Sequence, residues 1–205
     1  MRKIAFLVII ALTIGISSYA QKRAFRFDGG LNGGLLVSQM SGDALAGWDK
    51  PGITAGGWVH INYNNPWGTF LGMAYVPKGS RKNADQDNGD FDTFILQLDY
   101  LDIPILATYK TERFRFNLGP SLGILLRQNI KFNGTDFSVD PSFRRFDASM
   151  AAGVTWFASR NIHLELRGST SFIPVRPAPA IVNPGSFYER GNYNHVLQFC
   201  VHYSF

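Results

Sequence analysis

The feature that most constrains this chain is a strict alternation of apolar residues with polar or small ones over long segments. Between Arg113 and Arg127, every even position is apolar. A period of two places successive side chains on opposite faces of a β-strand, whereas an amphipathic helix needs apolar residues three and four positions apart. The Gly119-Pro120 pair would also break a helix. This segment is therefore predicted to be one long strand.

The same alternation recurs along the chain, most clearly in 146–156, 162–167 and 193–205. Eight strands are predicted in all, and they lie at about 24–39, 52–63, 67–79, 92–109, 113–128, 143–158, 161–175 and 191–205. The two faces are least clear in the third strand. In the fourth, the apolar positions change from even to odd at Tyr100-Leu101, which predicts a β-bulge there.

The links between these strands are of two kinds. Three are tight turns near 64–66, 110–112 and 159–160, and the other four are runs of roughly 12 to 15 residues rich in Gly, Asp, Asn, Ser and Pro. An even number of antiparallel strands, joined alternately by short turns and long loops, is typical of outer-membrane barrels. The predicted fold class is all-β, an eight-stranded antiparallel up-and-down transmembrane β-barrel.

The direction of the two faces distinguishes a membrane barrel from a soluble one, whose apolar face would point inward. The polar face carries small residues and a few charges, as suits a narrow lumen with paired ions; the charged residues are Arg115, Arg145, Asp147, Glu165 and Arg167. Aromatic residues gather on the apolar face near the turns, as in an interfacial girdle; they are Phe25, Phe27, Tyr63, Trp67, Tyr109, Phe114, Trp156, Phe157, Tyr203 and Phe205. We therefore expect the apolar face to contact outer-membrane lipid.

The two ends of the chain carry signals for export and insertion. Met1-Arg2-Lys3 is basic, Ile4–Ile16 is an almost unbroken apolar run of 13 residues, and Ser18-Tyr19-Ala20 offers a cleavage site. Such a run is too short for a membrane-spanning helix, which needs about 20 residues. We expect residues 1–20 to be a cleaved signal peptide and 21–205 to form the barrel. The terminal Phe205 resembles the signal read by the outer-membrane insertion machinery.

Composition excludes two further classes of protein. With 45% hydrophobic and 17% charged residues, the chain is not disordered. The net charge of +5 includes Arg2 and Lys3 of the signal, and no dense basic patch interleaved with aromatic residues remains, so no nucleic acid is expected as a partner. The single cysteine, Cys200, allows no internal disulfide and is expected to fill space in the lumen.

Two motifs resemble the PorT-type outer-membrane β-barrel family. They are Tyr100-Leu101-Asp102-Ile103-Pro104-Ile105-Leu106 and Gly119-Pro120-Ser121-Leu122-Gly123. The acidic position of the first motif is usually Glu in that family and is Asp102 here. The resemblance implies an eight-stranded barrel of the outer membrane. It implies no single function and supplies no catalytic residues, although the namesake is an accessory of a protein secretion system.

Residues that could carry chemistry are sparse, so no catalytic residue, cofactor or metal is predicted. The histidines do not show the spacing of a zinc site; they are His60, His163, His195 and His202. An acid–base role is conceivable for His163, Glu165 and Arg167 on one inward face, but paired lumen ions are the simpler interpretation. Serines near the outer rim are expected to have no histidine at their height; they are Ser38, Ser41, Ser80 and Ser171.

Two of the predicted long loops have distinctive compositions. Segment 84–92 holds four carboxylates but departs from the spacing of a calcium loop, so a solvated surface loop is expected. Segment 174–179 is rich in proline and is expected to be stiff.

The function expected from these features is that of a monomeric, non-enzymatic barrel with a packed, non-conducting lumen. Eight strands leave an interior just wide enough for side chains. Its role would be structural or accessory, aiding secretion or envelope assembly through loops or a periplasmic rim that meet a protein partner in the envelope. The alternatives are a soluble secreted ligand-binding β-barrel and a rim-located lipid-modifying enzyme.

Overall fold

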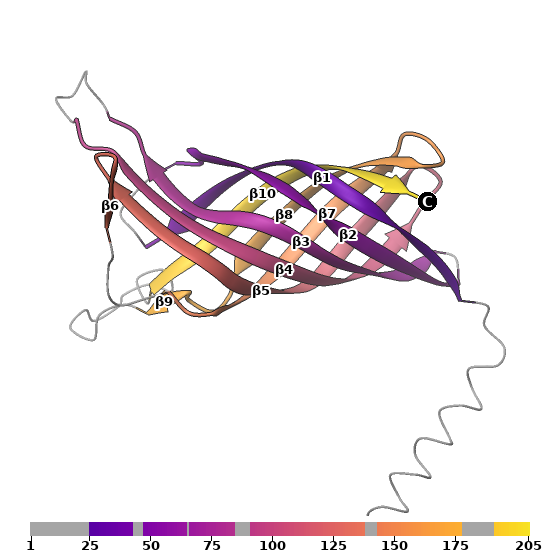
Figure 1. Cartoon of the computed structure of the whole chain (residues 1–205). Coiled ribbons are helices and arrows are strands. Elements are labelled where there is room, and N and C mark those ends of the chain that lie inside the picture. The colour runs from indigo at the N-terminus through magenta and orange to yellow at the C-terminus, as the bar shows by residue number, and fades with distance from the viewer. Residues whose placement is uncertain (1–24, 43–46, 65, 85–90, 138–142, 178–190) are drawn as a thin grey trace, which may run out of the picture.

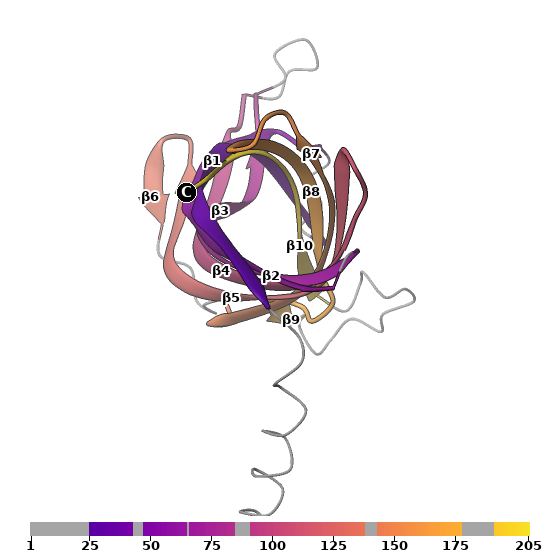
Figure 2. The same cartoon turned by 90° about the vertical axis from the view of Figure 1, so that its right-hand side faces the viewer.

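Long antiparallel strands wind around a common axis and close into a barrel, seen from the side in Figure 1 and along its axis in Figure 2. This computed structural model describes residues 25–42, 47–64, 66–84, 91–137, 143–177 and 191–205. Within those ranges, no helix is long and apolar enough to cross a bilayer. The predicted signal peptide lies outside them, so its cleavage stays a prediction.

The ring consists of eight strands, each paired with the next, and β1 pairs with β10 to close it. These strands are β1 (Arg26–Ser41), β2 (Lys50–Asn64), β3 (Trp67–Lys82), β4 (Phe94–Lys110), β5 (Phe114–Phe132), β7 (Phe146–Phe157), β8 (Ile162–Ser171) and β10 (Gly191–Ser204). Two short strands lie beside the ring: β6 (Thr135–Phe137) pairs with β5, and β9 (Arg176–Pro177) pairs with β10. The predicted fold class and its eight strands are confirmed.

The two ends of the barrel differ as the sequence predicted. Short turns join β2 to β3, β4 to β5 and β7 to β8 at the end where the C-terminus lies, which we call the turn end (Figure 1). The other links lie at the opposite, loop end. The link between β1 and β2 spans only residues 42–49, shorter than expected, because both strands continue further toward the loop end.

The alternating pattern assigns the faces of each strand as expected for a membrane barrel. In β5, Phe116 and Leu118 are exposed on the outer surface, whereas Arg115 and Asn117 are buried in the lumen. The third strand, whose faces were least clear from sequence, carries the buried Phe70 inward. Since the large apolar side chains point outward, the soluble ligand-binding alternative does not fit this structure.

Exposed aromatic side chains surround the turn end, as predicted for a girdle. They are Phe25, Phe27, Trp67, Tyr109, Phe114, Trp156, Tyr203 and Phe205. Tyr63 packs edge-on against Phe25, with the ring centroids 5.8 Å apart. Phe157 was wrongly placed in the girdle: Trp156 takes the outward position, so Phe157 turns inward, where its ring lies 4.8 Å from that of His163.

The β-bulge predicted in β4 lies in the neighbouring strand instead. Asp99 is opposite Arg127 and Tyr100 is opposite Leu125, so the residue without a partner is Leu126 of β5. The predicted position of the bulge along the barrel axis was right, but the bulge lies in β5 and not in β4.

The apolar residues of β4 do not change faces as the bulge prediction required. Leu96, Leu98 and Tyr100 are all buried inside the barrel, on the same face as Asp102. The change from even to odd apolar positions in the sequence has another cause. The inward face of β4 is apolar toward the loop end and becomes polar at Asp102, toward the turn end.

Candidate functional site

An ion network centred on Lys78 of β3 crosses the middle of the lumen. Lys78 Nζ lies 2.9 Å from Asp102 Oδ1 of β4 and 3.0 Å from Asp147 Oδ2 of β7. Ser171 Oγ donates to Asp147 Oδ1 at 2.6 Å, and Asn194 Nδ2 donates to Asp147 Oδ2 at 2.9 Å. Buried ions are tolerated when they are paired and hydrogen-bonded in this way.

Sequence reasoning missed Lys78, because the faces of its strand were ambiguous. A signal was nevertheless present. Trp67, Leu71 and Met73 put the apolar face of this strand at odd positions, which directs Lys78 inward. Inward-facing carboxylates such as Asp147 also require a buried cation nearby.

A second network, centred on Glu165 of β8, lies closer to the turn end. Arg167 donates two hydrogen bonds to Glu165 Oε1, from Nε at 3.2 Å and Nη2 at 2.9 Å, and Arg167 Nη2 lies 2.7 Å from Glu165 Oε2. His202 Nε2 lies 2.7 Å from Oε2, and Asn117 Nδ2 donates to Oε1 at 2.7 Å. The predicted pairing of Arg167 with Glu165 is confirmed, and every oxygen of this carboxylate is occupied.

Arg145 does not join either network, contrary to the sequence prediction. It is exposed, and β7 begins one residue later at Phe146. Its place at the rim follows from this strand boundary, which the alternating pattern set three residues too early.

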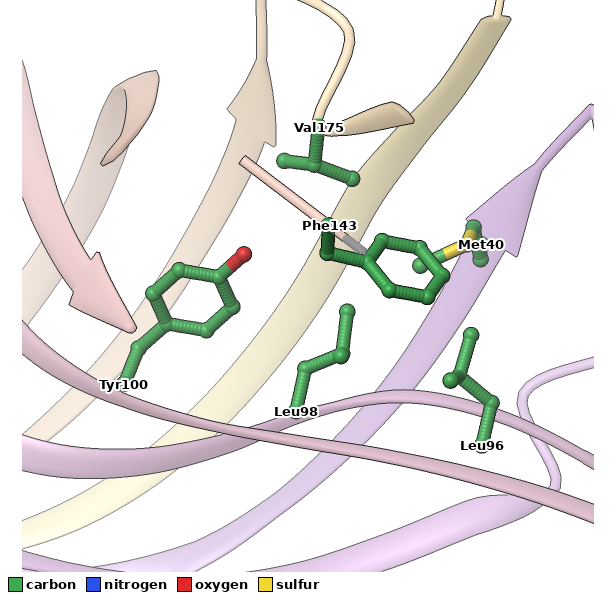
Figure 3. Packing of buried hydrophobic residues seen from close by; sticks show 6 residues of the cluster. All are labelled: Met40, Leu96, Leu98, Tyr100, Phe143 and Val175. Carbon is green, nitrogen blue, oxygen red and sulfur yellow. The ribbon is translucent and has the colours of Figure 1, made fainter. Parts of the chain in front are cut away.

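An apolar cluster fills the lumen at the loop end (Figure 3). This loop-end cluster consists of Met40, Leu96, Leu98, Tyr100, Phe143 and Val175. Phe143 and Val175 come from links rather than barrel strands, and the backbone bond from Arg144 N to Val175 O, at 2.8 Å, holds these links together. Phe143 and Val175 therefore pack against the lumen-facing side chains of β1 and β4 at this end.

A cavity of about 360 Å³ opens at the turn end of the lumen. Arg115, Trp58, Phe157 and His163 form part of its inner wall, and Lys110 lies at the end of β4 beside them. We call this space the turn-end cavity. Ligand sites are commonly concave spaces of about 300–1,000 Å³ that combine apolar walls with a few polar groups.

Two of the four histidines, His163 and His202, are opposite each other where β8 pairs with β10. His60 Nε2 lies 2.8 Å from Thr108 Oγ1, His202 contacts Glu165, and His163 lines the turn-end cavity. No group of three or more metal-ligating side chains occurs among the residues that the structure describes.

A serine–histidine pair occurs near the loop end, which the sequence did not predict. Ser41 Oγ lies 2.7 Å from His195 Nε2, and His195 Nδ1 lies 3.3 Å from Thr170 Oγ1. The prediction that rim serines have no histidine at their height is wrong for Ser41. The reason is the closing β1–β10 register, where Ser41 is opposite Tyr193, two residues from His195.

The remaining predicted features have mixed outcomes. Cys200 is buried in the lumen as expected. Arg176 and Pro177 form β9 and pair with Asn192 and Gly191, so part of the proline-rich segment adds to the sheet. Most of the acidic segment 84–92 lies outside the described residues, and its interpretation as a surface loop stays a prediction.

Several solved structures of bacterial proteins align with this chain. Ail, the attachment invasion locus protein of Yersinia pestis, aligns with a TM-score of 0.53 at 13% identity over 87% of this chain and 98% of Ail. A second Ail structure, in complex with the heparin analogue sucrose octasulfate, gives 0.51 at 15% identity over 88% and 99%. Neisserial surface protein A gives 0.48 at 12% identity over 89% and 99%. These likenesses concern the fold alone.

The sequence itself supplies the family. No curated protein matches the chain. The family model described as outer membrane protein beta-barrel domain matches residues 19–176, which includes most of the ring. The narrower PorT-type resemblance stays a prediction. The closed ring of strands, the outward apolar face and this match agree: the chain belongs to the outer membrane protein beta-barrel domain family.

Proposed function

We propose that this protein is a non-conducting outer-membrane barrel with a structural or accessory role, whose loop end and turn end meet partners in the cell envelope. The observation that carries the proposal is the filling of the lumen. The loop-end cluster, the Lys78 network and the Glu165 network occupy it at successive heights.

The polar contacts cross the lumen rather than following its wall. Lys78 of β3 reaches Asp147 of β7, and these strands are separated in the ring by β4 and β5. Asn117 of β5 similarly reaches Glu165 of β8, past β7. A solute passing through would have to separate these buried ion pairs, which costs several kcal/mol because each charge is left buried without its partner.

A conductance measurement tests the packed lumen. The full-length protein is reconstituted into planar bilayers, and its folded state is verified by a difference in gel migration between unboiled and boiled samples. We expect no unitary conductance steps. Regular steps from the folded wild type would contradict a sealed lumen and favour a role in solute passage.

Site-specific photo-crosslinking in cells tests the accessory role. Trp48 and Phe91 are large exposed side chains in the links of the loop end. A crosslinker at either position is expected to trap a discrete protein partner, while one at the lipid-facing Leu118 traps none. If all three positions give only the uncrosslinked monomer, the barrel does not act through loop-end protein contacts.

A second candidate function, hydrolysis of a lipid ester, is favoured by the contact between Ser41 and His195. A histidine within hydrogen-bond reach of a serine can act as its general base. Leu197 shares the outward face of β10 with His195, so the pair lies on the outer surface of the barrel. This position gives access to membrane lipid rather than to the lumen.

The hydrolase candidate is tested with a long-chain p-nitrophenyl ester and the folded protein in detergent. Activity that disappears in Ser41→Ala would support it. Ser38→Ala is the matched control, because Ser38 is buried and its hydroxyl donates to Gly79 O at 3.1 Å. Equal rates for Ser41→Ala, Ser38→Ala and the wild type would reject the candidate.

A further inference from the structure

Arg115 is a buried cation whose charge is not neutralised by direct contact. Its side chain points into the lumen from the second residue of β5 and is 3% exposed. Its Nε and Nη2 atoms have no hydrogen-bond partner in the part of the chain that the structure describes, where it also forms no ion pair. Arg167, on the same side of the barrel, is by contrast fully paired with Glu165.

The guanidinium of Arg115 lies in the wall of the turn-end cavity between two aromatic rings. Its Cζ atom is 5.5 Å from the Phe157 ring centroid and 6.0 Å from that of Trp58. Cation–π contacts at such distances orient the group but supply no acceptor for its N–H donors. His163, also in this wall, has a buried Nδ1 without a hydrogen-bond partner among the described residues.

The charges around the cavity favour a negatively charged occupant. Three cations line it, and they are Lys110, Arg115 and Arg160. The two lining carboxylates belong to Asp28 and Glu112, and Asp28 Oδ2 already accepts a hydrogen bond from Asn62 at 2.8 Å. The lining thus carries one more positive charge than negative charges. Arg115 is a buried cation without a paired carboxylate among the described residues, and the planar donors of its guanidinium match an oxyanion.

We propose that the turn-end cavity binds a small organic anion with one oxyanion group, a carboxylate or a phosphate, on an apolar body. Arg115 contacts the oxyanion, Lys110 and Arg160 attract it at the entrance, and Trp58 and Phe157 pack against the apolar part. The side chains that form the cavity face the lumen rather than the lipid, so the ligand enters from the aqueous space at the turn end. This binding function is independent of whether the lumen conducts.

The test is calorimetric titration of the folded full-length protein in detergent with benzoate, a carboxylate on an apolar ring. Inorganic phosphate and neutral benzyl alcohol are titrated separately. We expect saturable binding of one benzoate per chain, weaker binding of inorganic phosphate and none of benzyl alcohol. Equal binding of benzoate and benzyl alcohol would show a merely apolar pocket and overturn the proposal, as would the absence of saturable benzoate binding.

Substitution identifies the cation responsible. Arg115→Gln is expected to weaken benzoate binding by about tenfold or more, since charge-assisted hydrogen bonds are lost. Arg127→Gln, an exposed arginine toward the other end of the same strand, is the matched control and should bind as the wild type does. Equal affinity of the two variants would overturn the assignment.

Variants at the entrance keep the test decisive if Arg115→Gln does not fold. Lys110 ends β4 and Arg160 lies in the turn between β7 and β8, so Lys110→Gln and Arg160→Gln should leave the boiled and unboiled gel migration distinct. Each is expected to weaken benzoate binding by about two- to fivefold, as for solvent-screened charges. Unchanged affinity in both would contradict binding at this cavity.

Discussion

Lys78 Nζ and Asp147 Oδ2 lie 3.0 Å apart, although their strands are not neighbours in the ring. This pair spans the lumen, and both side chains are almost fully shielded from solvent. Asp102 shares the same ammonium group, which joins three strands at one point. The interior of the barrel therefore contains a buried, charge-paired contact across the ring, whereas its outer face carries many exposed apolar side chains.

Removal of the Lys78 charge should destabilise the barrel strongly. In Lys78→Met, Asp102 and Asp147 become uncompensated buried carboxylates, and we expect a loss of about 3–5 kcal/mol in the free energy of unfolding. Urea unfolding in lipid vesicles, followed by gel migration, measures it. Lys131→Met is the control. Lys131 Nζ lies 3.5 Å from Asp136 Oδ1, both side chains are exposed, and such a pair contributes about 1 kcal/mol or less. Equal losses in the two variants would contradict the role of Lys78.

Closure of the barrel should depend on Gly34 in β1. A Cβ atom added there would lie 2.0 Å from Phe199 O in β10, a backbone atom that cannot move independently. Gly34→Ala is expected to reduce the fraction of protein that attains the compact, unboiled gel form. In Gly33→Ala, the nearest atom to the added Cβ is Thr54 O at 3.7 Å, so folding should be normal. Similar folding yields for both alanine variants would show that β1 and β10 can separate without cost.

Packing of the loop-end cluster should be measurable through Leu98, which is fully buried. Leu98→Ala leaves a cavity among Met40, Tyr100 and Phe143, and the expected cost is about 2–5 kcal/mol. Phe91→Ala, at an exposed side chain of a link, should change stability by no more than about 0.5 kcal/mol. Equilibrium unfolding of both variants checks this difference, and a neutral Leu98→Ala would mean that the cluster is loosely packed.

The outer surface of β5 should show the depth dependence of a bilayer. Leu118→Arg places a charge on the exposed apolar face in the middle of the crossing, where the expected cost is about 2–4 kcal/mol. Leu126→Arg, eight residues further toward the loop end on the same face, should cost about 0–1 kcal/mol near the interface. Unfolding of both from vesicles gives the comparison. A reversed order would mean that the membrane band lies closer to the loop end.

The strands and the direction of their faces were predictable from local pattern. A period of two is a property of the extended backbone itself, so Phe116, Leu118 and Arg115 could be assigned to opposite faces without knowing any neighbour. The three short turns followed from the same reasoning. The pairing of Arg167 with Glu165 was also accessible, because residues two apart in a strand share a face.

Contacts between distant strands were not predictable in this way. The bulge at Leu126 depends on how β4 and β5 pair, and the contact of Ser41 with His195 depends on the register at which β1 meets β10. A local pattern contains neither register. Phe157 is different, because adjacent strand residues face opposite sides; the outward position of Trp156 already implied that Phe157 turns into the lumen, and this local signal was missed.

The sequence by itself determined a barrel with an apolar outer face, because side-chain alternation and turn spacing are local and a bilayer admits few other solutions. Only the tertiary structure decided which lumen charges are neutralised. Lys78 and Arg115 are both inward cations, yet Lys78 contacts two carboxylates and Arg115 contacts none among the residues that the structure describes. The difference arises from distances across a closed ring, which depend on the register of all eight strands together.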